Sequence, residues 1–346
     1  MSGRLGVGLA GCGERGAYIA EALSRAPRTR LAAVADADPG RARSLGGRFR
    51  AEWTSDAGKL MARPDLEAVF IATPHHLHTP LVVQAAEAGK AVLVEKPLAE
   101  SLASAREAVA AVRRAGVPFS VCFCQRYQPV VQKAKALAEA GAVGDLLGTL
   151  LLLYEDKAAA YWSGGLKGGA VSGWRGSKRE SGGGVLAMKA VHYFDLLRFL
   201  TGLEIAEVSA TAATVEAPVE VEDTMSLWLR WSNGAPGAVH ASFAVRGGGV
   251  PEDLRVWGKD GQLSLAPPGQ FYSLRMVGGK RPGQWHPMAP LPRIGDEMVE
   301  YVDRFAAALL EGRRPDIPGE EGLAVQAVLE AAYGSAREGR PAKVER

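Results

Sequence analysis

The first third of the chain alternates short hydrophobic runs with stretches that have the hydrophobic spacing of a helix. Uninterrupted hydrophobic runs are typical of strands that are buried on both faces of a sheet. The predicted strands are Leu5–Ala10, Leu31–Ala35, Val69–Thr73, Ala91–Val94 and Phe119–Phe123. The predicted helices are Ala17–Arg25, Pro80–Ala88 and Leu102–Ala115, the last with Ser101 as its N-cap. This βαβ alternation predicts a doubly wound parallel sheet with right-handed crossovers.

After about residue 126 the pattern changes to that of helices combined with an antiparallel sheet. Hydrophobic and polar residues alternate over Thr224–Trp231, and Asn233-Gly234 then provides a hairpin turn before a second strand at 238–245. Such alternation leaves one face of the sheet free for solvent or for another subunit. The other predicted elements are helices at 130–140, 297–310 and 320–337, a strand at 147–154 and a glycine-rich segment at 163–184.

Length and composition agree with this two-part organisation. A chain of 346 residues exceeds the usual size of one hydrophobic core, so we expect domains at residues 1–125 and 126–346. A net charge of +3 without long runs of one sign gives no reason to expect nucleic acid or an anionic membrane as a partner. No hydrophobic run approaches the length of a membrane span, and the first residues lack a signal-peptide pattern.

The chain has three cysteines, Cys12, Cys122 and Cys124, without Cys-x-x-Cys spacing. An odd number with this spacing favours free thiols in a reducing compartment and argues against a zinc site. We therefore expect a cytoplasmic protein whose cysteines act as small buried hydrophobic residues.

A glycine motif, Gly11-x-Gly13-x-x-Gly16, follows the first predicted strand and leads into a helix. The first glycine permits a tight turn, the second lets the backbone approach a pyrophosphate, and the third allows the helix to pack closely on the strand. Asp36 ends the second strand, 20 residues after Gly16. A carboxylate there binds a ribose diol and repels a 2′-phosphate. The motif therefore predicts a site for NAD, with NADP less favoured.

Two more polar segments follow predicted strands, at the sheet edge where such folds bind ligands. The first is Thr73-Pro74-His75-His76-Leu77-His78, and the second is Glu95-Lys96-Pro97. Three histidines within four positions could indicate a metal site. Without an acidic or cysteine partner nearby, a polar loop that leads into a helix is the better interpretation, so no metal is expected. Lys96 is a candidate functional residue, although many lysines at strand ends are only solvated.

Taken together, these motifs resemble the Gfo/Idh/MocA family, the glucose–fructose oxidoreductases and inositol dehydrogenases. The resemblance continues along the chain through Arg126-Tyr-x-Pro129, Trp174-Arg175, Gly182–Gly184, His192-x-x-Asp195, Val221–Thr224 and Gly312–Pro315. It implies an N-terminal Rossmann domain and a C-terminal α+β domain with a large, mainly antiparallel open sheet. It also implies dimers or tetramers formed through that sheet, and Trp228 lies on the predicted free face. The implied activity is NAD(P)-dependent oxidation or reduction of a sugar, polyol or related hydroxy compound.

The resemblance also implies a set of site residues. It places Lys96 beside the nicotinamide and the substrate, and Trp174-Arg175 near the cofactor. The expected cofactor-binding residues are Gly11, Gly13, Glu14, Arg15, Gly16, Asp36, Thr73, Pro74, His75, His78, Glu95, Lys96, Gln125, Trp174 and Arg175. Tyr161, Trp162 and the residues from 163 to 179 are expected to line the substrate pocket.

The three glycines at 182–184 lead into a predicted helix that carries four further candidates. At about 100° per residue, Met188, Lys189, His192 and Asp195 fall on one largely polar arc, opposite an apolar stripe. The family's frequent pattern here is Asp-x-x-x-His. His192 matches the histidine, but Met188 occupies the position of the acid, which leaves the proton path and the substrate open.

These residues give a mechanistic hypothesis. His192 would act as general base in oxidation and general acid in reduction, and Lys96 would stabilise the developing alkoxide. A buried, hydrogen-bonded histidine is the structural alternative for His192. Lys189 would bring positive charge to the substrate or to His192, or simply reach solvent. Asp195 would orient the helix or a substrate hydroxyl.

Two rival functions stay open at this stage. One is a dinucleotide-binding regulator without catalysis, and the other is an NAD-dependent glycosidase of the same fold. The sequence specifies neither the substrate nor the direction of the reaction.

Overall fold

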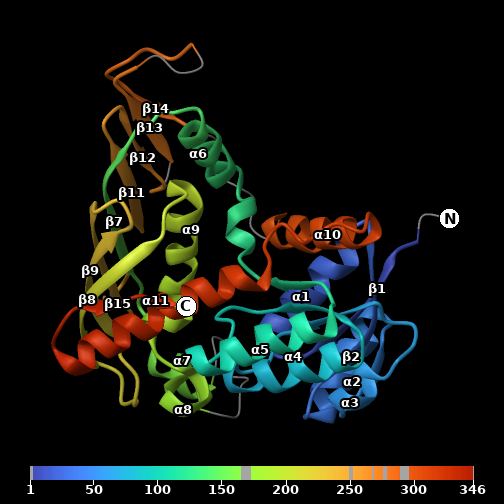
Figure 1. Ribbon diagram of the computed structural model, residues 1–346. Coiled ribbons are helices and arrows are strands. Elements are labelled where there is room, and N and C mark those ends of the chain that lie inside the picture. The colour runs from blue at the N-terminus through green and yellow to red at the C-terminus, as the bar shows by residue number, and fades with distance from the viewer. Residues whose placement is uncertain are drawn as a thin grey trace.

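A computed structural model describes residues 3–164, 173–248, 252–266, 269–275, 279–288 and 296–345. Two sheets organise the chain (Figure 1). The first has six strands in the order β3-β2-β1-β4-β5-β6, and every neighbouring pair is parallel. Its strands are β1 (Leu5–Ala10), β2 (Thr29–Ala35), β3 (Glu52–Thr54), β4 (Ala68–Ile71), β5 (Ala91–Val94) and β6 (Phe119–Val121). This order is that of a doubly wound dinucleotide-binding sheet, as predicted.

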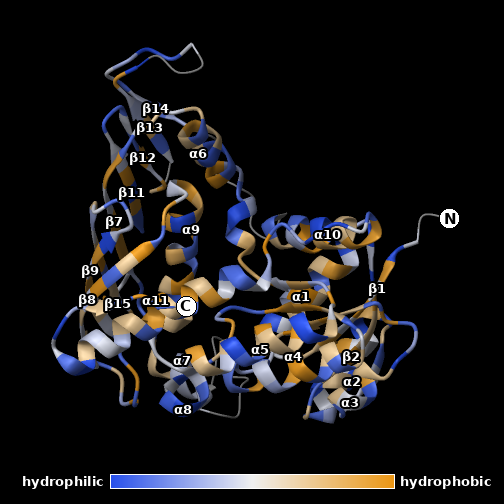
Figure 2. Cartoon of the chain, in the orientation of Figure 1, coloured by the Kyte–Doolittle hydropathy of each residue, from blue (hydrophilic) through white to orange (hydrophobic). Residues whose placement is uncertain are grey.

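Helices connect the strands of the first sheet. They are α1 (Glu14–Arg25), α2 (Pro39–Phe49), α3 (Ala57–Met61), α4 (His78–Glu87) and α5 (Leu102–Ala115). Ser101 caps α5 by accepting the amide of Ser104, as predicted. The hydrophobic pattern does not reveal α2, β3 and α3, because α2 contains three glycines and the other two elements are very short. Helices in this half mix hydrophobic and hydrophilic residues, as amphipathic helices do (Figure 2).

The second sheet has nine strands in the order β14-β13-β12-β11-β7-β10-β9-β8-β15. Only the β7–β10 pair is parallel, so the prediction of a mainly antiparallel sheet is confirmed. The strands are β7 (Leu146–Tyr154), β8 (Ile205–Ala213), β9 (Thr224–Trp231), β10 (Pro236–Ser242), β11 (Asp253–Gly258), β12 (Gly261–Ser264), β13 (Gln270–Ser273), β14 (Trp285–Pro287) and β15 (Ala342–Lys343). The hairpin of β9 and β10 turns at the predicted Asn233-Gly234 pair.

Among the described residues, helices pack against one face of the second sheet and not against the other. The helices on the covered face are α6 (Pro129–Glu139), α9 (Val191–Thr201) and α11 (Gly319–Glu338) (Figure 1). On β9, Leu227 and Leu229 are buried whereas Trp228 between them is 68% exposed. The short helices α7 (Ala159–Gly164) and α8 (Lys178–Ser181) lie near the first domain.

Helix α10 (Asp296–Leu310) returns to the first sheet. The Tyr301 ring contacts Phe70 of β4 edge to face at 6.2 Å between ring centres, and its hydroxyl lies 2.9 Å from Ser120 Oγ of β6. Asp303 forms an ion pair with Arg28. Helix α10 thus packs against the first sheet, although it lies within residues 126–346 of the sequence.

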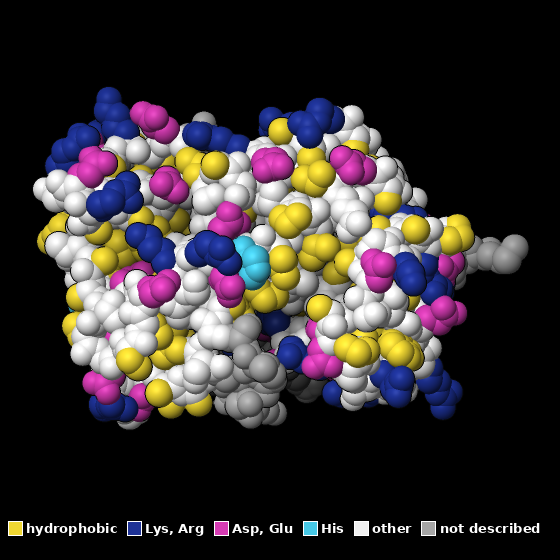
Figure 3. Space-filling view, turned by 90° about the horizontal axis from the view of Figure 1, so that it is seen from below, with side chains coloured by type: hydrophobic (Ala, Val, Ile, Leu, Met, Phe, Trp, Pro, Cys, Tyr) yellow, Lys and Arg dark blue, Asp and Glu magenta, His cyan; other side chains and the backbone are white. Residues whose placement is uncertain are grey.

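Within the described residues, none of the helices has the length and apolar composition needed to cross a membrane. Figure 3 shows positive and negative side chains interspersed over one face of the molecule, without a continuous patch of either sign there.

Candidate active site

A cavity of about 1830 Å³ runs along the carboxyl ends of the first sheet's strands and reaches α9 of the second domain. Most of the predicted site residues line it: Gly11, Gly13, Glu14, Arg15, Asp36, Thr73, Pro74, His75, His78, Glu95, Lys96, Tyr161, Trp174, Arg175 and His192. Gly16, Gln125, Lys189 and Asp195 are not among the described residues that line it.

The three motif glycines have three different surroundings. Gly11 has φ +103°, and a Cβ there would press against the carbonyl of Ala72. A Cβ on Gly13 would meet no atom within 4 Å, so this position opens onto the cavity. A Cβ on Gly16 would collide with the carbonyl oxygen of Gly11, so a glycine is needed where the first turn of α1 packs against the loop. Helix α1 begins directly after Gly13 without a side-chain cap, so the positive end of the helix dipole is directed at the cavity, where a phosphate would be stabilised.

Asp36 ends β2 at the cavity wall. Its Oδ2 accepts the amide of Cys12 at 2.7 Å, and its Oδ1 accepts the amide of Asp38 at 2.9 Å. These bonds fix the carboxylate beside the glycine loop, and a carboxylate has further lone pairs for a ribose diol. The position is therefore suited to NAD and unfavourable for a 2′-phosphate.

Replacing Asp36 with alanine is expected to reduce the preference for NADH over NADPH by about tenfold, because a repulsive charge is removed. Fluorescence titration of both cofactors measures the ratio of their dissociation constants. Asp56→Asn, a second carboxylate on the cavity wall, is the matched control and should leave this ratio unchanged. An Asp36→Ala protein with the wild-type ratio would contradict the assignment.

The histidines after β4 bind main-chain carbonyls. His78 lies between the carbonyls of Pro97 and Thr73, each at 3.0 Å, and His75 Nδ1 lies 2.7 Å from the carbonyl of Ser181. Burial lowers the pKa of both imidazoles. Within the part of the chain that is described, no group of histidine, cysteine and acidic residues could hold a metal ion. His75 and His78 thus join the two strand-end segments to each other and to α8.

Lys96 lies at the end of the cavity closest to the second domain. Its Nζ donates to the carbonyl of Met188 at 2.8 Å. The neighbouring Glu95 is buried and pairs with Arg15 at 2.7 Å, so it is not paired with the lysine side chain. Burial lowers the pKa of Lys96 to about 8, while Glu95 opposes this shift. A lysine in this state exchanges a proton near neutral pH.

The helix predicted after the three glycines is present, but it begins with a π-helical turn, Leu186–Ala190, that continues into α9. Because this wider turn rotates the residues around the axis, the predicted four-residue arc is wrong. Met188 and His192 face the cavity, but Lys189 and Asp195 turn elsewhere.

Lys189 forms ion pairs with Glu155 at 2.7 Å and with Glu252 at 3.1 Å. These partners raise its pKa against the effect of burial, so it stays protonated. Its charge lowers the pKa of both Lys96 and His192. The predicted effect of Lys189 on the pKa of His192 is therefore consistent with the structure. Lys189 itself is not among the described residues that line the cavity.

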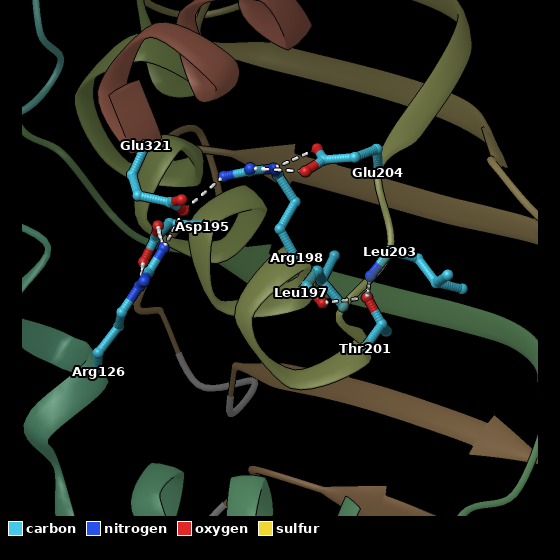
Figure 4. A network of polar contacts seen from close by, with 8 residues as sticks. All are labelled: Arg126, Asp195, Leu197, Arg198, Thr201, Leu203, Glu204 and Glu321. Atoms are coloured by element: carbon cyan, nitrogen blue, oxygen red, sulfur yellow. Dashed lines mark hydrogen bonds and ion pairs between the residues drawn. The ribbon is translucent and has the colours of Figure 1, made fainter. Parts of the chain in front are cut away.

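Asp195 is buried in an ion-pair network that the sequence analysis did not foresee (Figure 4). Both of its oxygens accept from Arg126, at 2.8 and 2.5 Å. Arg126 also binds Glu321 of α11 at 2.6 Å, and Glu321 in turn binds Arg198 of α9 at 3.1 Å. Asp195 therefore holds α9 against the segment that follows β6, which agrees with the expectation that it orients the helix, and it is not among the described residues that line the cavity.

Replacing Asp195 with asparagine is expected to lower the free energy of unfolding by about 3 kcal/mol, because it leaves the buried Arg126 partly uncompensated. Urea denaturation measures this change. Asp303→Asn, at an ion pair in which Arg28 is half exposed, should lower it by less than about 1 kcal/mol. Equal effects at the two positions would argue against the network's role.

His192 lines the cavity one turn into the helix and packs against Phe123 edge to face. Its Nδ1 is buried and has no hydrogen-bond partner among the described residues. Burial, followed by the charges of Lys96 and Arg15, places its pKa well below the ordinary value. The imidazole is therefore neutral at physiological pH and able to accept a proton. The alternative interpretation, a buried histidine whose ring nitrogens are hydrogen-bonded within the protein, does not hold for Nδ1 of His192 among the described residues.

The glycines before the π turn serve close packing. A Cβ at Gly182 would collide with the main chain of Glu100, one at Gly183 with the Tyr333 hydroxyl, and one at Gly184 with the carbonyl of Glu222. The triple glycine therefore brings this turn against three other segments, and Gly182–Gly184 does not line the cavity.

Aromatic residues close the substrate end of the cavity. The Arg175 guanidinium lies about 5 Å from the ring centres of both Tyr161 and Trp174, and Trp174 contacts His75. Trp162 is buried behind them. Residues 165–172 of the predicted pocket segment lie outside the described part of the chain.

The sequence analysis missed the far end of the cavity. Its additional lining residues there include Asp38, Arg41, Ser55, Asp56, Leu77, Leu81, Gln84 and Glu87. Asp38 caps α2 and Asp56 caps α3, so an Asp before each of these helices was the available signal. The polar face of α4 has no motif that would reveal it.

Two family profiles match the chain. Residues 5–123 match the oxidoreductase family with an NAD-binding Rossmann fold, GFO_IDH_MocA, and residues 131–264 match the GFO/IDH/MocA C-terminal domain.

Similar proteins include several named dehydrogenases. Inositol 2-dehydrogenase of Rubrobacter xylanophilus is 30% identical over 99% of this chain and 94% of its own length. D-apiose dehydrogenase of Paraburkholderia graminis is 30% identical over 91% of this chain and 83% of its own. Among solved structures, levoglucosan dehydrogenase in complex with NADH has a TM-score of 0.88 at 27% identity, covering 99% of this chain and 100% of that one.

Proposed function

The chain belongs to the Gfo/Idh/MocA family of NAD-binding oxidoreductases, and on that premise we propose that it transfers a hydride between nicotinamide and a carbinol or carbonyl carbon of a sugar or polyol. The observation that carries the proposal is the convergence of Lys96 and His192 at one end of the dinucleotide cavity. The named relatives that act on inositol and apiose support the substrate class.

The cavity fits NAD by two observations. Gly13 leaves open space in front of uncapped helix amides, where a pyrophosphate is stabilised. Thr73 Oγ1 is a buried oxygen at the cavity wall without a partner among the described residues, so it is free to bind the cofactor. When bound, nicotinamide supplies the acceptor or donor of the hydride.

In oxidation, neutral His192 accepts the proton of the substrate hydroxyl, and in reduction its protonated form returns it. The Lys96 ammonium donates a hydrogen bond to the same oxygen and stabilises negative charge as it develops there. Met188 contributes an apolar surface at the position where the family resemblance predicts an acid, so the proposed proton path in this chain involves His192, with Lys96 beside it.

A spectrophotometric screen of sugars, polyols and their oxo forms, with NADH and NADPH followed in parallel, tests the proposal. Turnover of at least one such compound with an NAD preference is expected. Cofactor binding without turnover would favour a regulator. Release of an aglycone without net NADH formation would favour a glycosidase.

We further propose that the uncovered face of the second sheet, which carries Trp228, associates with other copies of the chain. Exposed large aromatic residues on a sheet without covering helices support this assignment. The three cysteines are unpaired and buried, which supports the proposed reducing, cytoplasmic location.

A further inference from the structure

The contact that holds Lys96 comes from a main-chain carbonyl within a π-helical turn. The amide of Met188 donates to Gly184, four residues back, whereas the amide of Val191 donates to Leu186, five residues back. In α9 the spacing returns from five residues to four, and such a return leaves one carbonyl without an amide partner in the helical ladder. Such interruptions are frequent at functional sites. Here the Met188 carbonyl is turned toward Lys96 Nζ, 2.8 Å away.

Glu222 anchors this turn from another segment of the chain. Its carboxylate accepts the amides of Gly184 at 2.9 Å and Leu186 at 3.0 Å, and its carbonyl accepts the amide of Val185 at 3.0 Å. These are the first amides of the helical segment, which have no intrahelical acceptor. The Tyr333 hydroxyl donates to the same carboxylate at 2.9 Å. Glu222 therefore caps the N-terminus of this helical segment, although it lies 38 residues after Gly184 and 36 residues after Leu186 in the sequence.

We propose that Glu222 is a positioning residue for Lys96: by capping the π turn it fixes the Met188 carbonyl, which orients the lysine ammonium beside His192. This inference rests on the proposed function, because the orientation of the lysine matters only if Lys96 takes part in the proposed reaction. The residue at 188 acts through its main chain, so a thioether in place of an acid does not disturb the lysine.

The hydrogen bond to Met188 has a chemical consequence. An ammonium has three N–H donors, and one of them occupied by a fixed carbonyl leaves the others directed into the cavity. A carbonyl acceptor favours the charged form and so opposes the effect of burial on Lys96. Among the described residues, the other charged or titratable groups that interact with Lys96 include Glu95, Arg15, Lys189, Cys122, His75 and His192.

The test compares Glu222→Gln with wild type in the protein without cofactor. The glutamine side chain has one oxygen and one NH₂ group, and the NH₂ group must face one of the donors that the Glu222 carboxylate now accepts. The π turn should therefore loosen, and the hydrogen bond between Lys96 Nζ and the Met188 carbonyl should weaken. The pKa of Lys96 should fall, and acetic anhydride labelling of Lys96 at neutral pH, measured by peptide mass spectrometry, should rise about fivefold. With substrate, kcat should fall about tenfold while the dissociation constant of NADH changes by less than about twofold.

Asp223→Asn is the matched control. Asp223 is equally buried and its carboxylate accepts the amides of Val215, Glu216 and Ala217, away from the π turn. This variant should lose stability but keep wild-type labelling of Lys96. Labelling and kcat in Glu222→Gln that match those in Asp223→Asn would overturn the proposal, as would labelling below the wild-type rate.

Tyr333→Phe provides a milder variant in case Glu222→Gln does not fold. It removes one of the hydrogen bonds to Glu222 and should raise the labelling of Lys96 in the same direction, by about twofold. Unchanged labelling in folded Tyr333→Phe would also overturn the proposal. Because labelling needs neither cofactor nor substrate, its result is independent of whether the proposed reaction occurs.

Discussion

Replacing Lys96 with methionine is expected to lower kcat/KM by about 10³-fold while NADH binding stays within about threefold of wild type. The side chain is half-buried, lines the cavity and carries the only ammonium hydrogen-bonded to Met188 in the described residues. Methionine keeps most of the volume but removes the donor that would stabilise an alkoxide. Steady-state kinetics together with fluorescence titration of NADH separate the two effects.

Lys90→Met serves as the control for this variant. Lys90 also binds main-chain carbonyls, those of Arg63 and Leu66, but it lies outside the cavity lining. It should retain near wild-type kinetics. A Lys96→Met enzyme with more than about a tenth of wild-type kcat/KM would remove Lys96 from the chemistry.

Replacing His192 with asparagine is expected to lower kcat/KM by about 10²- to 10³-fold and to change the pH profile. The pKa of His192 lies well below the ordinary value, so it is neutral and active as a base at neutral pH. Oxidation by wild type should therefore decline only as the pH falls through this depressed pKa. The variant lacks the base and should lose that acid limb. His240→Asn, on the far face of the second sheet, is the control and should behave as wild type.

Lys96 is expected to control the alkaline side of the pH profile of activity. Its pKa is lowered to about 8, and its ammonium form is the one that stabilises negative charge. Activity should therefore decline as the pH rises through about 8, and this alkaline limb should disappear in Lys96→Met. A variant that keeps the limb would assign it to another group.

The cofactor half of the site was predictable because its signals are local. The glycine motif, the strand before it and Asp36 are close in sequence, and continuous hydrophobic runs identify the buried strands. The family resemblance extended this to Lys96, His192 and Trp174-Arg175, all of which line the cavity.

The second half was less predictable because its determinants come from distant segments. The ideal helical period failed at Leu186–Ala190, since the cap for that turn is supplied by Glu222 and not by a preceding residue. Asp195 and Lys189 have the polarity of site residues, but Arg126 and Glu155 bind them from elsewhere in the chain. Spacing along one helix does not contain this information.

Hydride transfer at a sugar or polyol carbon can be followed with NADH that carries deuterium at C4 of the nicotinamide. The enzyme is incubated with a panel of oxo-sugars and oxo-polyols, and mass spectrometry and NMR follow the label. Deuterium bound to a new carbinol carbon of the product, with loss of that signal in Lys96→Met, is the result the account predicts. NADH that binds but retains its deuterium with every compound would contradict it.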